Sequence, residues 1–245
     1  MRDETLQENK AGRIRTWLIF AVITALAVIV YEFSLDYLPF ENGEIILSGN
    51  KYLSKEEILQ FIDVSEGKSI EKVDTKDWEL RLKQNSRIRS VSVNRRSRSK
   101  ILISVQERIP KYTVFSNGVL YELDEDWAIV SENDCRSRDI LVLSGDFKPT
   151  ENSFKEDVVL RDFAKSVYKV LDIYPELKTR VSEFSKSEDG SIYLYLDTPK
   201  HLKIAIGTSL GSVQIRKMYS ALAYFETNKL TVNNLDLRGD DAVFQ

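Results

Sequence analysis

Cysteine and histidine are nearly absent from this sequence of 245 residues, which holds one of each, Cys135 and His201. A single cysteine cannot form an internal disulfide, and one cysteine with one histidine excludes zinc sites built from these two residue types. The chain must therefore fold on its apolar core alone, which a domain of this size can do. We interpret Cys135 as a small core or loop residue, with a free reactive thiol as the alternative, and His201 as an exposed turn residue.

No residue pattern in the chain identifies an active site. Residues 207–211 (GTSLG) are similar to a phosphate-binding loop, but the lysine of that motif is missing and the start of a helix explains them better. The run Asp124, Glu125 and Asp126 suggests carboxylate catalysis or calcium binding, although a solvated hairpin turn also accounts for it. We therefore assign no catalytic, cofactor-binding or metal-binding residue, and we predict a protein that is not an enzyme and takes no small-molecule substrate.

Composition and charge are ordinary for a globular protein. Charged residues make up 30% of the chain and hydrophobic residues 42%, and the net charge is −3. A chain with so small a net charge has no strong field for nucleic acid, which we exclude as a partner. About 205 residues follow Leu38, enough for two small domains or one large one.

The longest apolar run is Trp17–Tyr31, which contains no charged residue. Extended to Leu38 it reaches the length of about 20 residues that a membrane-spanning helix needs. Lys and Arg precede the run and acids follow it, so the positive-inside rule places the N-terminus in the cytoplasm. This predicts a cytoplasmic tail at 1–16, a transmembrane helix at 17–38, and a single-pass protein of the bacterial inner membrane whose C-terminal bulk is extracytoplasmic. A cleaved signal peptide and a buried core helix are the alternatives.

Residues 44–107 predict a small α+β arrangement. Residues 44–47 (EIIL) form a short strand, and Ser54 with Glu57 three residues later is a capping box that begins a helix. A second helix, capped by Asp74 or Thr75, runs to about Gln84, and a strand over the alternating string ELRLK is the weaker alternative. Residues 88–95 and 100–106 then suit two half-buried strands joined by a polar hairpin. The predicted order is strand, helix, helix, strand, strand.

The remainder predicts a mainly antiparallel sheet with two helices. Asn117-Gly118 between apolar runs is a strong hairpin signal. Apolar residues at helical spacing predict helices over about 153–173 and 209–225. Short strands are predicted at 112–115, 119–123, 128–130, 181–184, 191–196, 203–206 and 231–238.

The end of the chain is a candidate binding edge. A β-rich domain that ends in a strand offers unpaired backbone groups to another chain, and strand addition uses such groups. Leu235, Leu237, Val243 and Phe244 lie close to the C-terminus, and residues 239–241 can bend the chain between them. The alternative is that these side chains pack inward. Phe244 is the better candidate for an exposed anchor.

Two motifs in this order resemble a known family. Residues 45–58 (IILSGNKYLSKEEI) resemble the opening of a POTRA domain, and residues 101–110 (ILISVQERIP) resemble the exit strand of FtsQ/DivIB bacterial division proteins. Residues 141–145 (LVLSG), 202–212 (LKIAIGTSLGS) and 234–244 (NLDLRGDDAVF) resemble later landmarks of that family. Gly239 stands where the family commonly has an aromatic residue.

The resemblance implies a POTRA-like domain at 39–109 and an FtsQ-type β domain at 110–245. It implies a non-enzymatic scaffold that binds FtsB- and FtsL-like division proteins at the septum and, through them, regulates the septal peptidoglycan synthase. The partner would add a strand near the C-terminal end, at Leu235, Asp236, Leu237, Arg238, Val243 and Phe244. A POTRA-bearing component of protein export or outer-membrane assembly is the alternative function.

The strongest charge feature is residues 81–100, which hold eight basic residues and no acid. Within it Arg95, Arg96, Arg98 and Lys100 form a candidate basic patch for anionic lipid or an acidic partner. A merely solvated hairpin is the alternative. The predicted fold class is α+β, with an N-terminal transmembrane helix, a POTRA-like β-α-α-β-β domain, and a mixed, mainly antiparallel β domain with two helices.

Overall fold

The computed structural model describes Trp17 and residues 20–31, 43–64, 70, 72–137, 141–198 and 201–245. The chain divides into two compact units. The larger unit comprises Leu47–Val64, Asp74–Asn94 and Leu102–Gln245. The smaller comprises Met1–Ile46, Ser65–Val73 and Arg95–Ile101. The predicted boundary between residues 109 and 110 stays a prediction.

The N-terminal apolar run requires a correction. Trp17 and residues 20–31 are helical, and the rest of the predicted span, 18–19 and 32–38, lies outside the described residues. In the part of the chain that the structure describes, no helix has the length and apolar character to cross a membrane. This overturns the predicted transmembrane helix at 17–38 and the single-pass inner-membrane location inferred from it. The predicted tail at 1–16 lies outside the described residues.

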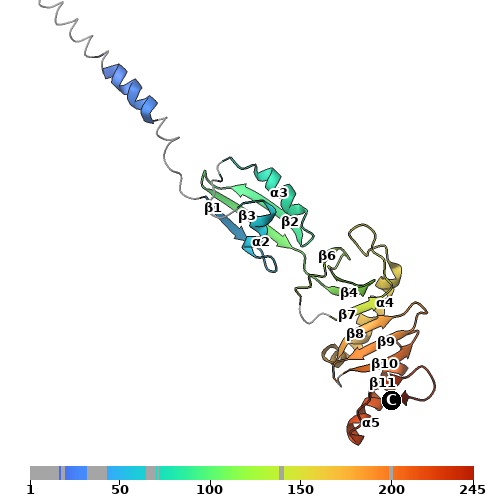
Figure 1. The fold of residues 1–245 in the computed structure, drawn as a ribbon. Helices are drawn as coiled ribbons and strands as arrows, with labels where there is room; N and C mark the ends of the chain where they lie inside the picture. Colours follow the sequence, from blue (N-terminus) through green and yellow to red (C-terminus); the bar gives the residue numbers. More distant parts are fainter. Residues whose placement is uncertain are drawn as a thin grey trace, which may run out of the picture. The chain divides into compact units, whose positions relative to one another are not determined.

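The elements between residues 44 and 107 follow the predicted order (Figure 1). They are β1 (Glu44–Ser48), α2 (Lys55–Phe61), α3 (Thr75–Lys83), β2 (Ile88–Arg95) and β3 (Lys100–Glu107). The strands form a three-stranded sheet in the order β1-β3-β2. The capping box at Ser54 and Glu57 is confirmed, because the Ser54 hydroxyl accepts the Glu57 N–H and the Glu57 carboxylate accepts the Ser54 N–H. Asp74 caps α3 by accepting the Lys76 N–H.

Nine further strands form one large sheet. In chain order they are β4 (Tyr112–Ser116), β5 (Val119–Leu123), β6 (Ile129–Glu132), β7 (Val142–Gly145), β8 (Val181–Lys186), β9 (Ile192–Leu196), β10 (Leu202–Gly207), β11 (Asn234–Asp236) and β12 (Val243–Phe244). Their spatial order is β12-β11-β10-β9-β8-β7-β4-β5-β6, so β12 and β6 are the two edges. Three neighbouring pairs are parallel, namely β10 with β11, β4 with β7, and β7 with β8. The described chain is therefore α+β with a large mixed sheet.

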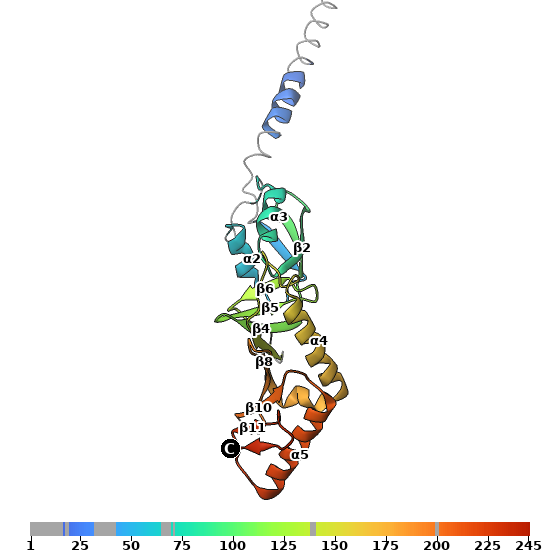
Figure 2. The same cartoon turned by 90° about the vertical axis from the view of Figure 1, so that its right-hand side faces the viewer.

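Two helices cover one face of this sheet. Figure 2 shows α4 (Val158–Ile173) and α5 (Ser212–Asn228) on the same side of the strands. Their apolar stripes, which include Phe163 and Met218, pack in one core cluster with sheet residues such as Phe184 and Leu194. A 3-10 helix, η1 (Pro175–Thr179), follows α4. Among the described strands, β12 and β6 are the edges where backbone groups can pair with another chain.

Several element ends differ from the sequence prediction. Helix α4 begins at Val158, five residues after the predicted start, because Asp157 accepts the Leu160 N–H and caps the helix there. Helix α5 runs from Ser212 to Asn228 and ends at Lys229, which adopts a left-handed conformation. The predicted last strand at 231–238 is shorter, and a separate strand, β12, follows it.

Candidate functional site

The C-terminal edge of the nine-stranded sheet is formed by β12. This strand pairs antiparallel with β11, with Leu235 opposite Phe244 and Asp236 opposite Val243. The Asn234 N–H donates to the Gln245 carbonyl (3.2 Å) and the Gln245 N–H donates to the Asn234 carbonyl (3.0 Å). Because residues in an antiparallel ladder alternate between bonding their neighbour and facing away, the N–H and C=O of Phe244 point outward. The outer side of β12 thus offers one donor and one acceptor.

The predicted binding residues separate into buried and exposed ones. Leu235 and Leu237 are each 1% exposed and belong to the core. Val243 is 64% exposed and Phe244 is 42% exposed. The inward-packing alternative therefore describes the two leucines, while Val243 and Phe244 lie at the surface where a partner can contact them.

Phe244 holds the last strand against α5, and Lys217 of α5 holds the turn that precedes this strand. The Phe244 ring centroid lies 4.9 Å from that of Phe225 and 6.3 Å from that of Tyr224. The Lys217 Nζ donates to the carbonyl oxygens of Gly239 and Asp240, at 2.9 Å each. A cavity of about 510 Å³ lies beside this contact, lined by residues of α5 and by Asp240, Asp241, Ala242 and Phe244. The edge therefore combines open backbone groups with an adjoining hollow.

Asp236 and Arg238 form the charged part of this edge. The Arg238 Nη2 lies 2.5 Å from the Asp236 Oδ2. The hydrogen bonds from the Arg238 side chain and N–H lower the pKa of Asp236 below its ordinary value. Both side chains lie at the surface, and because they are two residues apart in the chain, their pairing organises the turn after β11.

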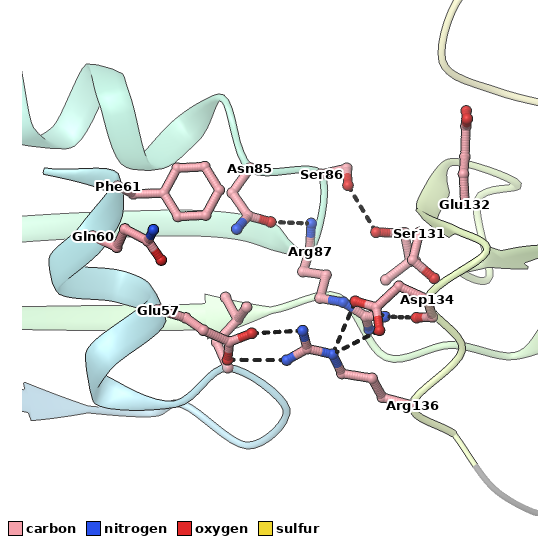
Figure 3. Close-up of a pocket in the computed structure, with 12 residues that line it drawn as sticks. Glu57, Gln60, Phe61, Asn85, Ser86, Arg87, Ser131, Glu132, Asp134 and Arg136 are labelled. Atoms are coloured by element: carbon pink, nitrogen blue, oxygen red, sulfur yellow. Dashed lines mark hydrogen bonds and ion pairs between the residues drawn. The ribbon is translucent and has the colours of Figure 1, made fainter.

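A second site lies in the larger unit, where α2, the start of β2 and the end of β6 surround a cavity of about 510 Å³ (Figure 3). Arg87 directly precedes β2 and is 4% exposed. Its Nη2 lies 2.9 Å from the carboxylate of Glu122, which is fully buried, and it also pairs with Asp134. Buried charges are tolerated only when they are paired in this way.

Glu122 is held charged by its surroundings. Burial by itself raises the pKa of this carboxyl, but hydrogen bonds from the Ser137 N–H and the Ser131 hydroxyl, with the charge of Arg87, outweigh burial. The net result is a pKa below the ordinary value. Since Glu122 lies on β5 and Ser131 on β6, the ion pair braces the edge strand against Arg87.

Glu57 serves two purposes at once. It completes the capping box of α2, and its two oxygens accept hydrogen bonds from the Arg136 guanidinium at 2.6 and 3.0 Å. These bonds from Arg136, with the Ser54 N–H, lower the pKa of Glu57 to about 2. In the same contact the pKa of Arg136 is raised. Figure 3 shows Glu57 reaching from α2 to Arg136.

The motif residue Glu107 fixes the loop that precedes α2, and its neighbour Arg108 pairs with Asp124 after β5. The Glu107 carboxylate accepts the N–H groups of Lys51, Tyr52 and Leu53, at 2.7 to 3.0 Å. The Arg108 Nη1 lies 2.6 Å from a buried oxygen of Asp124. Gly49 has φ +85°, and a Cβ there would lie 2.1 Å from the Val105 carbonyl oxygen. These contacts give both sequence motifs a structural reason.

The candidate basic patch lies in the smaller unit. Arg96 and Arg98 are exposed, whereas the Arg95 Nη2 donates to the carbonyls of Ile70 and Val73. The Lys100 Nζ lies 2.7 Å from the Glu44 carboxylate. The predicted contact of this patch with a lipid or a partner stays a prediction.

Residues 207–211 have the G-x-S-x-G spacing and connect β10 to α5. A strand–turn–helix context of this kind is typical of a nucleophile elbow. The chain's one histidine, His201, precedes β10, at the far end of a strand about 20 Å long from Ser209. It therefore cannot act as a base for Ser209. Among the described residues, no group of three His, Cys, Asp or Glu side chains can hold a metal ion.

Sequence reasoning missed the ion-pair cluster of Glu57, Arg87, Glu122, Asp134 and Arg136. Its two most distant members, Glu57 and Arg136, are 79 residues apart in the sequence, so no local spacing connects them. The one available signal was Glu57, whose capping role explained it fully. Long-range ion pairs of this kind become visible only when the strands are placed.

A comparison with known protein families identifies one domain of this chain. Residues 40–108 match a POTRA domain, which is a non-catalytic module for protein–protein interaction. The matched domain is of the FtsQ type, which suggests a scaffold role in cell division in general terms. Among the curated proteins, no match was found.

Proposed function

We propose that this chain is a non-enzymatic scaffold of bacterial cell division. In this proposal it binds FtsB- and FtsL-like division proteins and, through them, helps to regulate septal peptidoglycan synthesis. The FtsQ type of the matched POTRA domain supports this role over the alternative in protein export or outer-membrane assembly.

The observation that carries the proposed binding mode is the outer side of β12. Phe244 directs a backbone N–H and C=O away from the sheet, and Val243 and Phe244 expose apolar surface beside them. Strand addition takes its affinity from main-chain hydrogen bonds and its specificity from the neighbouring side chains. A partner strand laid along β12 would use both.

The remaining predicted residues support this edge from beneath. Leu235 and Leu237 anchor β11 in the core, and the Asp236–Arg238 pair shapes the turn that returns the chain to β12. We therefore assign direct contact to Val243 and Phe244 and a positioning role to the other four residues.

Two substitutions at one position test the binding mode. Phe244→Ala removes the ring, and Phe244→Pro removes the ring and the outward N–H as well. Proline is tolerated on edge strands where the N–H faces outward, so the fold is retained. We expect an FtsB-like division protein of the same bacterium to bind Phe244→Pro about tenfold more weakly than Phe244→Ala.

Val159→Thr serves as the matched control. Val159 is an exposed apolar residue of α4 that does not line the cavity beside β12, so the affinity of this variant should stay close to that of the unmodified chain. Equal affinities for Phe244→Pro and Phe244→Ala would show that the partner does not pair with β12 through this N–H, and would overturn the strand-addition mode.

A further inference from the structure

The other edge of the nine-stranded sheet presents a similar pair of backbone groups. Directly after β6, the Asn133 N–H donates to the Leu120 carbonyl at 2.7 Å. The alternation of an antiparallel ladder then directs the N–H and C=O of Glu132, one residue earlier, away from β5. The next outward carbonyl on this edge, that of Val130, already accepts the Ser86 hydroxyl at 2.8 Å. Glu132 is therefore the open position of this edge.

The wall of the cavity on the side of α2 and α3 carries side-chain amides that keep hydrogen-bonding groups free for a ligand. Gln60 and Asn85 both line the cavity. In the described part of the chain the Gln60 side chain has no hydrogen-bond partner, and the Asn85 side chain uses only its oxygen, which accepts the Arg87 N–H. Figure 3 shows these two amides and the Phe61 ring on one wall, with Ser131 on the other. Phe61 is 46% exposed, so the same wall also offers apolar surface.

The charges around the cavity are already paired with each other. Glu57 binds Arg136, Glu122 binds Arg87, and Asp134 lies near both guanidinium groups. The Glu132 carboxylate points away from this cluster (Figure 3). The groups that remain for a ligand are the amides of Gln60 and Asn85 and the outward backbone of Glu132, all neutral. Arg87 Nη1 adds one buried donor that has no partner among the described residues.

We propose that this cavity, the β6 cavity, binds an extended and uncharged segment of a partner polypeptide. The segment pairs with the N–H and C=O of Glu132, its other backbone groups meet the Gln60 and Asn85 amides, and an apolar side chain lies on Phe61. A cavity of about 510 Å³ has the size of a ligand-binding cleft. Since it lies at the edge opposite β12, this site does not depend on the function proposed above.

A defined peptide tests the proposal on the full chain. The probe is a seven-residue peptide of alternating threonine and valine, with a lysine at each end for solubility and both termini blocked. Its comparator has the same side chains but N-methyl groups on alternate residues, which abolish strand pairing. Binding is followed residue by residue from backbone and side-chain amide NMR shifts.

We expect the probe to shift the Glu132 amide and the Gln60 and Asn85 side-chain amides, with a dissociation constant of about 1 mM or tighter. The N-methylated comparator should bind about tenfold more weakly. Glu132→Pro, which removes the outward N–H, should weaken the shifts at this site about tenfold relative to Glu132→Ala.

Phe61→Ser should also weaken binding, whereas Leu80→Ser should not. Leu80 is the matched control, because it is an exposed apolar residue on the neighbouring helix α3 and does not line the cavity. Absence of shifts at Glu132, or equal binding by Glu132→Pro and Glu132→Ala, would overturn the proposal. Shifts confined to Val243 and Phe244 would also overturn it while leaving the C-terminal edge supported, so the two sites fail separately.

Discussion

The two edges of the nine-stranded sheet present the same backbone geometry in opposite surroundings. At β12 the outward residue is Phe244, whose ring packs on α5 beside exposed apolar surface. At β6 it is Glu132, which borders a polar cavity braced by the buried pair of Arg87 and Glu122. An apolar, accessible edge is suited to a partner strand that brings its own side chains. A polar, braced edge is suited to a segment recognised mainly through its backbone.

Both edges are short, which is how natural sheets limit unwanted pairing. Strand β12 has two residues and β6 has four. On β6 the Ser86 hydroxyl covers the Val130 carbonyl, whereas on β12 the protection comes only from length. The difference predicts that substitutions in the ion-pair cluster disturb the β6 edge and the fold, while substitutions on β12 disturb binding alone.

The largest expected effect comes from breaking the brace of the β6 edge. Arg87→Met leaves the carboxylate of Glu122 buried without its guanidinium partner. Removing one member of a buried ion pair typically costs about 3 to 5 kcal/mol of unfolding free energy. Urea unfolding of the variant measures this loss.

Arg89→Ala is the control for that loss. Arg89 pairs with Glu125 and Asp126 at the surface, at 3.3 and 3.2 Å. Exposed pairs of this kind contribute about 0 to 1 kcal/mol. If Arg87→Met and Arg89→Ala lowered the unfolding free energy equally, the Arg87–Glu122 pair would not brace this edge.

At the C-terminal edge, the next largest effect separates Leu237, which follows β11, from Val243 on β12. Leu237→Ala opens a cavity in the core and should lower the unfolding free energy by about 2 to 5 kcal/mol. Val243→Ala alters an exposed side chain and should change it by no more than about 0.5 kcal/mol. Thermal or urea unfolding compares the two, and a loss at Val243 as large as that at Leu237 would contradict the division into support and contact residues.

A smaller effect concerns acid. The pKa of Glu57 is about 2 in the folded chain, below its ordinary value of 4.5. The unfolded chain therefore binds this proton more readily, so the stabilisation is present above about pH 4.5 and is lost as the pH falls towards 2. Glu57→Gln should flatten the decline of stability across this window.

Unfolding midpoints of Glu57→Gln and of the unmodified chain between pH 2 and 5 check this. Asp236→Asn is the counterpart at the other edge, where Arg238 lowers the pKa of an Asp in a surface pair. Its effect on the same curve should be smaller. A Glu57→Gln curve that is parallel to that of the unmodified chain would exclude the proposed linkage.

The smallest effect is expected at Gly239. An added Cβ there meets only the Asp241 carbonyl oxygen, at 3.8 Å, which is an ordinary contact. Gly239→Tyr should therefore change the unfolding free energy by no more than about 0.5 kcal/mol. A larger loss, seen in the same unfolding measurements, would show that the turn between β11 and β12 requires glycine.

Local signals in the sequence predicted much of this fold. The capping residues Ser54 and Asp74 determine helix starts from groups within three residues, and the Asn117-Gly118 turn joins β4 to β5. Such features depend on the nearest neighbours in the chain, so they can be deduced without the tertiary structure.

The features that escaped prediction depend on distant parts of the chain. Whether Leu237 faces the core or a partner depends on β10 and α5, and the pairing of Arg87 with Glu122 depends on how β5 is placed. The transmembrane helix predicted at 17–38 rested on hydropathy and flanking charges, whereas the described residues contain no helix long and apolar enough to cross a membrane. Hydrophobic patterning identifies a buried face, but the position of an edge follows only from the strand order.

A partner strand that pairs with the outward backbone of Phe244 must shield the N–H of this residue from water. Amide hydrogen exchange at Phe244, measured with and without a bound FtsB-like division protein, detects this pairing. The exposed Phe244 N–H should exchange rapidly in the free chain and become strongly protected in the complex. Unchanged exchange at Phe244 in a saturated complex would contradict this pairing.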